Sequence, residues 1–188
     1  MKILDQIKNE EVKEQEFNQA FEELEINNST LEKINFCEST FNYLEVANST
    51  INNSIFSNLD LSDQSFYKVK FTNCNFLGTN FSNAFLKEIE FANCNLSYST
   101  FSMAKLEEVT FKSCNLKEAS LYKMTQKKLK FKECNLEAID VFETNLQSID
   151  IRTCNINHIK IDIPSMKGLI VNEEQALALS KFLQIEIE

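Results

Sequence analysis

A large apolar residue occupies every fifth position of this chain, in one register, from Phe21 to Ile161. Gln126 is the one polar exception, and no insertion shifts the spacing. A period of five fits neither the helical repeat of about 3.6 nor the strand alternation of about 2. It also differs from a coiled-coil heptad, which mixes steps of three and four. The pattern therefore predicts a chain that turns a corner every five residues and directs one apolar side chain inward from each side.

A second period of twenty lies on top of the first. Cysteine recurs at twenty-residue intervals, two positions before an apolar centre, and asparagine follows each time. These cysteines are Cys74, Cys94, Cys114, Cys134 and Cys154. Four five-residue sides per coil explain both periods. Successive coils should then stack at the β-strand spacing of about 4.8 Å.

The segments CNFLG, CNLSY, CNLKE and CNLEA resemble the pentapeptide-repeat family, whose unit is a small residue, Asn or Asp, a central Leu or Phe, and two polar residues. The resemblance extends over roughly residues 19–163. It implies an all-β fold, a right-handed quadrilateral β-helix, because the hand and the square cross-section are properties of that family.

The two ends depart from the repeat. Residues 1–18 are predicted to form either an N-terminal cap or an imperfect first coil, because Phe17 and Phe21 are only four residues apart. Pro164 should end the repeat, since it cannot donate a ladder hydrogen bond. Residues 164–188 then form a C-terminal tail, in which Asn172 and Gln175 have the spacing of a capping box that begins a short helix.

Two roles are open for this helix: it covers the last coil, or it also joins two protomers. The tail resembles that of the quinolone-resistance (Qnr) type of pentapeptide-repeat protein, and this resemblance implies a homodimer. The residues that would form the dimer interface are Leu177, Leu179, Phe182, Leu183 and Ile185.

Composition narrows the function classes. The net charge of −9 argues against direct nucleic-acid binding, which requires basic patches. Neither a signal-peptide-like apolar segment nor a membrane span is present in the sequence, so we expect a cytoplasmic protein with reduced cysteines.

Catalytic and metal-binding patterns are also missing from the sequence. The cysteines of the column are twenty residues apart, which is typical of small residues that fill a core and not of metal ligands, which have short spacings. His158 is the single histidine and is expected on the outside, and two glycines are too few for a phosphate loop. We therefore expect no catalytic or metal site, no cofactor, no small-molecule substrate and no enzymatic activity. Gln126 is expected to distort its coil, with either drift or a small contact site as the reason.

The outward charges differ from side to side. The side centred on Phe21 through Ile161 is the acidic one, and its acids form a candidate partner-binding face: Glu22, Glu23, Asp60, Asp63, Asp140, Glu143 and Asp162. The Qnr resemblance implies a DNA mimic that binds the type II topoisomerases DNA gyrase and topoisomerase IV and protects against fluoroquinolones. Two features depart from that pattern: this face has no acids between Asp63 and Asp140, and the coils lack the loops that Qnr proteins bear.

The alternative function is a scaffold or adaptor for another protein, with no topoisomerase role. Outward apolar residues favour it, and Phe85 and Met103 are its candidate contact. A solvated acidic face without a partner is the remaining reading of the charge pattern.

Overall fold

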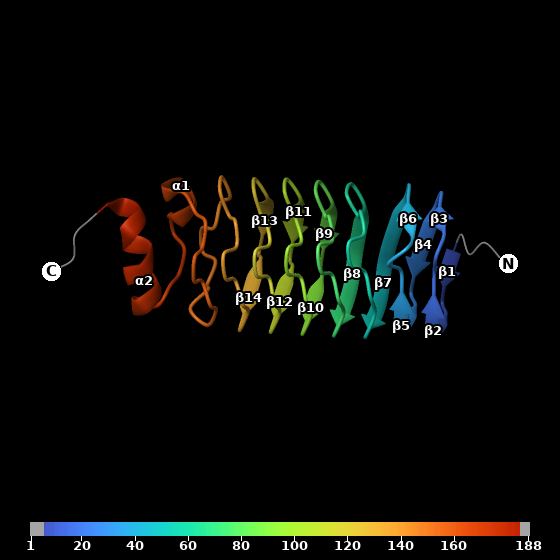
Figure 1. Cartoon of the computed structure of the whole chain (residues 1–188). Coiled ribbons are helices and arrows are strands. Elements are labelled where there is room, and N and C mark those ends of the chain that lie inside the picture. Colours follow the sequence, from blue (N-terminus) through green and yellow to red (C-terminus); the bar gives the residue numbers. More distant parts are fainter. Residues whose placement is uncertain (1–5, 185–188) are drawn as a thin grey trace.

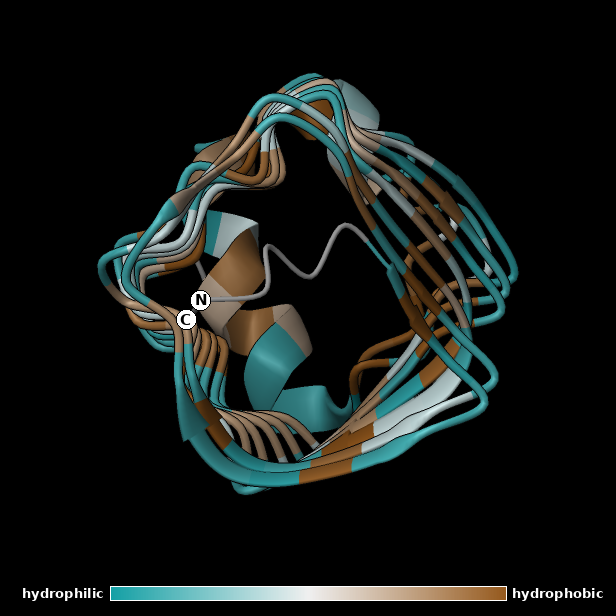
Figure 2. Ribbon diagram, turned by 90° about the vertical axis from the view of Figure 1, so that its right-hand side faces the viewer, coloured by the Kyte–Doolittle hydropathy of each residue, from teal (hydrophilic) through white to brown (hydrophobic). Residues whose placement is uncertain are grey.

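The chain forms a straight rod of stacked coils, closed at its C-terminal end by a helix (Figure 1). The computed structural model describes residues 6–184. Viewed along the rod, the coils superimpose into a four-sided tube (Figure 2). This architecture confirms the fold class expected from the sequence, an all-β quadrilateral β-helix followed by a short C-terminal α-helix.

The strands are short because each side of the coil is only five residues long. They are β1 (Gln6–Lys8), β2 (Glu11–Glu16), β3 (Ala20–Phe21), β4 (Leu24–Asn27), β5 (Thr30–Asn35), β6 (Thr40–Phe41), β7 (Leu44–Asn52), β8 (Ser65–Thr72), β9 (Phe85–Lys87), β10 (Glu90–Ala92), β11 (Lys105–Glu107), β12 (Thr110–Lys112), β13 (Thr125–Lys127) and β14 (Lys130–Lys132).

All strand pairing is parallel, and from the second coil onward the partners are twenty residues apart. Phe71, for example, pairs with Phe91, which pairs with Phe111. The first coil differs, because Ile7 pairs with Ile26 at a separation of nineteen residues. The four-residue step between Phe17 and Phe21 accounts for the shorter coil. Residues 6–18 thus stack on the second coil as a shortened coil.

The coil has four sides, which we number by their inward centres: the first runs from Phe21 to Ile161, the second from Ile26 to Leu146, the third from Leu31 to Ile151 and the fourth from Phe36 to Ile156. Apart from Phe41 and Gln126, which are half-buried, all these centres are buried and fill the tube. Aromatic centres stack face to face from coil to coil, as Phe91 does on Phe111 with ring centroids 5.0 Å apart. Burial of one such side chain contributes about 1.5–3 kcal/mol, so the column is the main source of stability.

The corners use a left-handed backbone conformation at the second residue after a centre. Asn73, Lys68 and Glu88 have φ angles of 55°, 53° and 57°. Glycine takes this position at Gly78 alone among the regular coils. The side chain at a corner points outward, and the ladder hydrogen bonds on both sides of the corner offset the local strain. This explains how a chain with two glycines turns so often.

The C-terminal segment caps the rod. Residues 168–170 still stack on the coil below, with the amide of Ile151 donating to the Ile170 carbonyl at 3.0 Å. Three short helical elements belong to this segment: α1 (Ile163–Met166), α2 (Glu173–Ser180) and the 3-10 turn η1 (Lys181–Leu183). The α1 turn was not expected from the sequence, although Pro164 suits its first turn.

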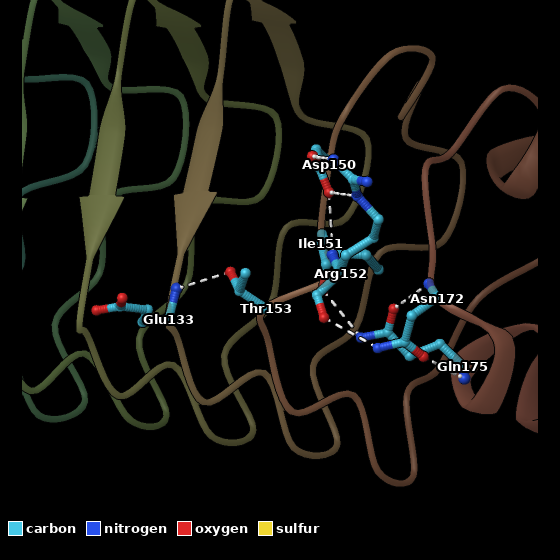
Figure 3. Close-up of polar contacts among 7 residues, drawn as sticks. All are labelled: Glu133, Asp150, Ile151, Arg152, Thr153, Asn172 and Gln175. Atoms are coloured by element: carbon cyan, nitrogen blue, oxygen red, sulfur yellow. Dashed lines mark hydrogen bonds and ion pairs between the residues drawn. The ribbon is translucent and has the colours of Figure 1, made fainter.

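The capping box of α2 has a second function (Figure 3). Asn172 accepts from the Gln175 amide at 2.9 Å, and the Gln175 side chain accepts from the Asn172 amide at 3.0 Å. The Gln175 side-chain nitrogen donates to the carbonyls of Ile151 at 2.9 Å and Cys154 at 2.8 Å. One buried glutamine therefore begins the helix and also satisfies two carbonyl groups of the coil that the helix covers.

Candidate interaction surfaces

The acidic face is divided by the structure into two groups. Glu22, Glu23, Asp60 and Asp63 lie in the N-terminal coils, and the remaining three acids lie in the coils next to the cap. The coils between them carry Asn, Ser and Thr on this side. The seven predicted residues share the first side but do not form one continuous patch.

Several of these carboxylates accept hydrogen bonds from the backbone or from a side chain of a neighbouring coil. Asp60 accepts from the Ser62 amide at 3.1 Å and from the Asn80 side chain at 2.9 Å. Asp140 accepts from the Phe142 amide at 3.1 Å. These are corner-stabilising interactions of the kind that short acidic side chains make in turns.

The other acids of this face differ in their exposure and in the groups that their carboxylates contact. Glu143 accepts from the Tyr122 hydroxyl at 3.0 Å and pairs with Lys123 at 3.3 Å. Burial acts to raise the pKa of Asp162, but hydrogen bonds from Ser165 and from the Glu143 amide outweigh it and hold that pKa below its usual value. Glu23 and Asp63 are exposed. Among the described residues, Glu143 is the only one of the seven acids in an ion pair, and the bonds to Asp60, Asp140 and Asp162 orient these carboxylates without neutralising them.

A neutral surface covers the first and fourth sides of the two central coils. Residues 71–86 and 91–104 include no charged residue, although a quarter of the chain is charged. Three large apolar side chains stand out on this surface: Leu77 at 36% exposure, Tyr98 at 56% and Met103 at 55%. We call residues 73–83 and 93–103 the neutral surface.

The polar side chains of the neutral surface are ordered by one another. The Asn95 side chain donates to Asn75 in the next coil at 3.1 Å, and the Thr100 and Ser102 hydroxyls lie 2.9 Å apart. The backbone beneath them is held by the coil ladder, as in the bond from the Phe101 amide to the Ser120 carbonyl at 2.7 Å. The surface is therefore preorganised, which lowers the entropy cost of docking.

The two residues of the predicted apolar contact differ in exposure. Phe85 lies in β9 on the second side, half-buried, with the Lys105 amine 5.2 Å from its ring centroid. Met103 stands exposed on the first side. Sequence reasoning missed Tyr98, although the absence of charge from residues 71–104, apart from the short stretch around residues 87–90, is visible in the sequence.

The predicted dimer residues divide into two groups. Leu179 is 7% exposed and packs, with the half-buried Phe182, against the core of the last coil. Leu177 and Leu183 are 59% and 50% exposed and point away from it. Ile185 lies outside the described residues. The helix therefore covers the rod with one edge and leaves an apolar edge free.

The cysteine column lies inside the tube. Each of the five thiols is free and buried, and Cys114, for example, lies 3.3 Å from the Phe91 carbonyl and 3.4 Å from the Lys112 carbonyl. The residues from 6 to 184 contain no group of three or more His, Cys, Asp or Glu side chains that could hold a metal ion. His158 is exposed at a corner, with a φ angle of 59°.

Gln126 keeps its place in β13 and pairs with Leu106 of β11. Its side chain is half-buried, donates to the Asn145 carbonyl at 3.3 Å and accepts from the Leu129 amide at 3.3 Å. The expected distortion is found just beyond it, where the following coil no longer continues the ladder.

Coils with five-residue sides, twenty-residue register and an apolar centre on each side define the class of protein, a pentapeptide-type β-solenoid. Residues 64–140 match the family described as "Pentapeptide repeat region", and the same geometry continues on both sides of that segment. Residues 64–140 are therefore a pentapeptide-repeat region.

Three solved structures illustrate the similarity. A trypsin-treated form of QnrB1, a plasmid-mediated fluoroquinolone resistance protein, is 14% identical, with 97% of each chain covered and a TM-score of 0.44. HetL, which is involved in heterocyst differentiation regulation in the cyanobacterium Nostoc, is 12% identical, covers 88% of this chain and 87% of its own, and has a TM-score of 0.43. A pentapeptide repeat protein of the Arabidopsis thaliana thylakoid lumen is 22% identical over 52% of this chain and 68% of its own, with a TM-score of 0.36.

A search of curated protein sequences finds no match. The solved structures have low identity and different reported roles, so a partner has to be argued from the surfaces of this chain. In the part of the chain that the structure describes, no helix is long and apolar enough to cross a membrane.

Proposed function

We propose that this protein is a non-catalytic binding rod that acts as a scaffold or adaptor, and that a protein partner docks on its neutral surface. The observation that carries this proposal is the absence of charge from residues 71–86 and 91–104 on a chain of net charge −9. The cores of protein interfaces are depleted in charged residues and enriched in Tyr and Met. The neutral surface has that composition, with Tyr98 and Met103 as its most exposed large side chains.

Site-specific photocrosslinking tests this proposal. A photoreactive phenylalanine analogue replaces Tyr98, and in a matched control it replaces Tyr43, which is 44% exposed and lies in an N-terminal coil. We expect irradiation of cells that produce the protein to give a discrete heavier product at position 98 and not at 43. Equal products at both positions, or none at 98, would contradict docking at the neutral surface.

A second candidate is DNA mimicry towards DNA gyrase or topoisomerase IV, with protection against fluoroquinolones. It is supported by the net charge and by the exposed carboxylates of Glu23 and Asp63. The uncharged centre of the first side counts against it. An elongated surface that mimics DNA needs a continuous negative potential to compete for a DNA-binding groove.

A supercoiling assay separates the two candidates. Purified protein is titrated into DNA gyrase with and without a fluoroquinolone, beside a variant with Asp60→Lys and Asp63→Lys. Rescue of supercoiling by the native protein and its loss in the variant would support DNA mimicry. No effect of the native protein at a large excess over the enzyme would exclude gyrase and leave the neutral surface as the site to pursue.

The apolar edge of the cap supports a further part of the proposal, that the rod is a homodimer. Leu177 and Leu183 are too exposed on the described chain to be explained by capping alone. A second copy in antiparallel contact would bury the same residues on both protomers, as a two-fold interface requires.

A further inference from the structure

The hydrogen-bonded ladder of the rod is interrupted at one junction. In the junction before it, the Glu108 amide donates to the Lys127 carbonyl at 2.7 Å. In the junction after it, the Ile170 amide donates to the Ile149 carbonyl at 2.8 Å. Between residues 124–133 and 144–153, within the described chain, no backbone–backbone hydrogen bond forms.

The interruption affects only the second and third sides. On the fourth side the Leu136 amide still donates to the Asn155 carbonyl at 2.7 Å, and on the first side Val141 still donates to Lys160 at 2.9 Å. On the third side a side chain takes the place of a backbone group: the Glu133 amide donates to the Thr153 hydroxyl at 3.1 Å (Figure 3). The coils therefore remain attached along two sides and separate along the other two.

This separation leaves β14 with a free edge inside the rod, in its C-terminal half. Elsewhere the amide of an inward centre donates to the next coil, as Phe101 does to Ser120. Phe131 makes no such bond within residues 6–184, and the Arg152 amide donates to the Asp150 carboxylate at 3.1 Å instead of to Phe131. An unpaired strand edge is a template for an added extended segment.

The edge opens into a groove with a volume of about 460 Å³. The groove is lined by β14 together with Lys128, Ser148, Asp150 and Thr153. A small, wholly apolar void lies behind it, between Phe131 and the aliphatic residues of the following coils. Ile151 succeeds Phe131 in the column of centres, and its smaller side chain does not fill the space that another phenylalanine would fill.

The groove is basic, although the protein is acidic. Lys112, Lys130 and Lys132 are exposed and form no ion pair with any described residue. Lys112 and Lys132 are ladder neighbours on the outside of the third side, and Arg152 takes the corresponding position in the next coil. This column of three bases crosses the free edge, and Arg152 within it is paired with Asp150 at 2.7 Å.

We propose that an acidic, extended segment of a protein partner docks along the free edge of β14. Its carboxylates pair with Lys130 and Lys132, and its main chain bonds to the free hydrogen-bonding groups of Phe131. Charge complementarity selects an acidic segment, and the net charge of −9 disfavours a nucleic acid at this site. This site lies on a different side from the neutral surface, so the inference does not rest on the function proposed above.

Fluorescence anisotropy with a defined probe tests the site. The probe is a fluorescein-labelled ten-residue peptide of alternating Glu and Val, and a Lys–Val peptide of the same length is its control. We expect the full-length protein to bind the Glu–Val peptide alone. Lys130→Glu should weaken binding at least fivefold, whereas Lys160→Glu, an equal charge change on the first side, should weaken it less than twofold.

Hydrogen exchange separates strand addition from mere charge attraction. The bound Glu–Val peptide should slow exchange of the Phe131 amide at least tenfold and leave the Phe101 amide, which is already bonded, unchanged. The proposal is overturned if the native protein does not bind the peptide, if both lysine variants lose affinity equally, or if Phe131 exchange does not change. Tighter binding of a ten-nucleotide oligothymidylate than of the peptide would also overturn it.

Discussion

At the scale of single residues, the cysteine column shows how burial decides chemistry. The thiol of Cys134 lies 3.4 Å from the Phe111 carbonyl and 3.3 Å from the Lys132 carbonyl. The neighbouring Cys114 thiol, together with burial, raises the pKa of Cys134 to about 11. The Cys134 thiol, together with burial, likewise raises the pKa of Cys154. Such thiols remain protonated at neutral pH, and the thiolate is the reactive form.

A thiol-reactive reagent should therefore distinguish Cys37 from the column. In the native protein at pH 8, we expect a disulfide reagent such as 5,5'-dithiobis(2-nitrobenzoic acid) to titrate one of the six cysteines, the half-buried Cys37, within minutes. Denatured protein should show all six and provides the control. Burial keeps the reagent away from all five thiols of the column. Raised pKa values also keep four of them protonated, namely Cys94, Cys114, Cys134 and Cys154, so labelling of the column should stay slow up to pH 9. Rapid labelling of several native thiols would contradict the buried column.

Residue positions in the coil could largely be predicted from the sequence, because the five-residue period alone fixes which side chains point inward. The outward contacts could not. Phe85 was expected to be a free apolar contact, yet Lys105 in the next coil covers its ring. Asp60 was expected to face a partner, yet it bonds to Ser62 and Asn80. Such contacts depend on side-chain length and rotamer between coils, which a periodic pattern does not specify.

At the scale of elements, β13 and β14 mark the weakest junction of the rod. Gln126 places an amide where Leu86 and Leu106 occupy the two preceding coils, and its hydrogen bonds are both long at 3.3 Å. We expect Gln126→Leu to raise the free energy of unfolding by about 1 kcal/mol, because apolar burial outweighs the loss of two weak hydrogen bonds. Gln147→Leu, at an exposed position, should change it by less than about 0.5 kcal/mol. Urea denaturation measures both, and a destabilised Gln126→Leu protein would show that the amide is structurally required.

The Gln175 side chain attaches the cap to the last coil, and an isosteric substitution measures its contribution to stability. Gln175→Glu keeps the shape and the acceptor for the Asn172 amide, but a carboxylate cannot donate to Ile151 and Cys154. We expect a loss of about 2–3 kcal/mol, because two buried carbonyls lose their donor and a charge is buried. Glu174→Gln, on the exposed face of α2, is the matched control and should have little effect. Equal stabilities of the two variants in thermal denaturation would refute the capping role.

The capping box that begins α2 could be predicted because its signal is local, three residues apart on one chain. The short α1 and the open edge of β14 could not, since both depend on how two coils meet. The substitution of Gln126 pointed to the right region, but the loss of the ladder on two sides also involves Ile151 and the side-chain bonds of Thr153 and Asp150.

At the scale of the whole molecule, the rod presents separate surfaces at different places along its length: a neutral one in the middle, a basic edge near the C-terminal end and an apolar edge on the cap. Parallel stacking with one register keeps these surfaces in fixed relation, because each coil contacts only its neighbours and the core is continuous. A rigid rod with separated surfaces is suited to holding partners apart at a set distance.

The apolar edge of the cap leads to a prediction about assembly. If two rods meet through their caps, a double variant with Leu177→Glu and Leu183→Glu should convert a dimer into a monomer in light scattering and leave the circular dichroism spectrum unchanged, because both side chains point away from the core. Leu179→Glu should instead destabilise the protein by about 3 kcal/mol or more, because that side chain is 7% exposed and packs on the last coil. If the native protein is monomeric at micromolar concentration, the proposed dimer is contradicted. In that case the exposed leucines would mark the end of the rod as a surface for a different partner.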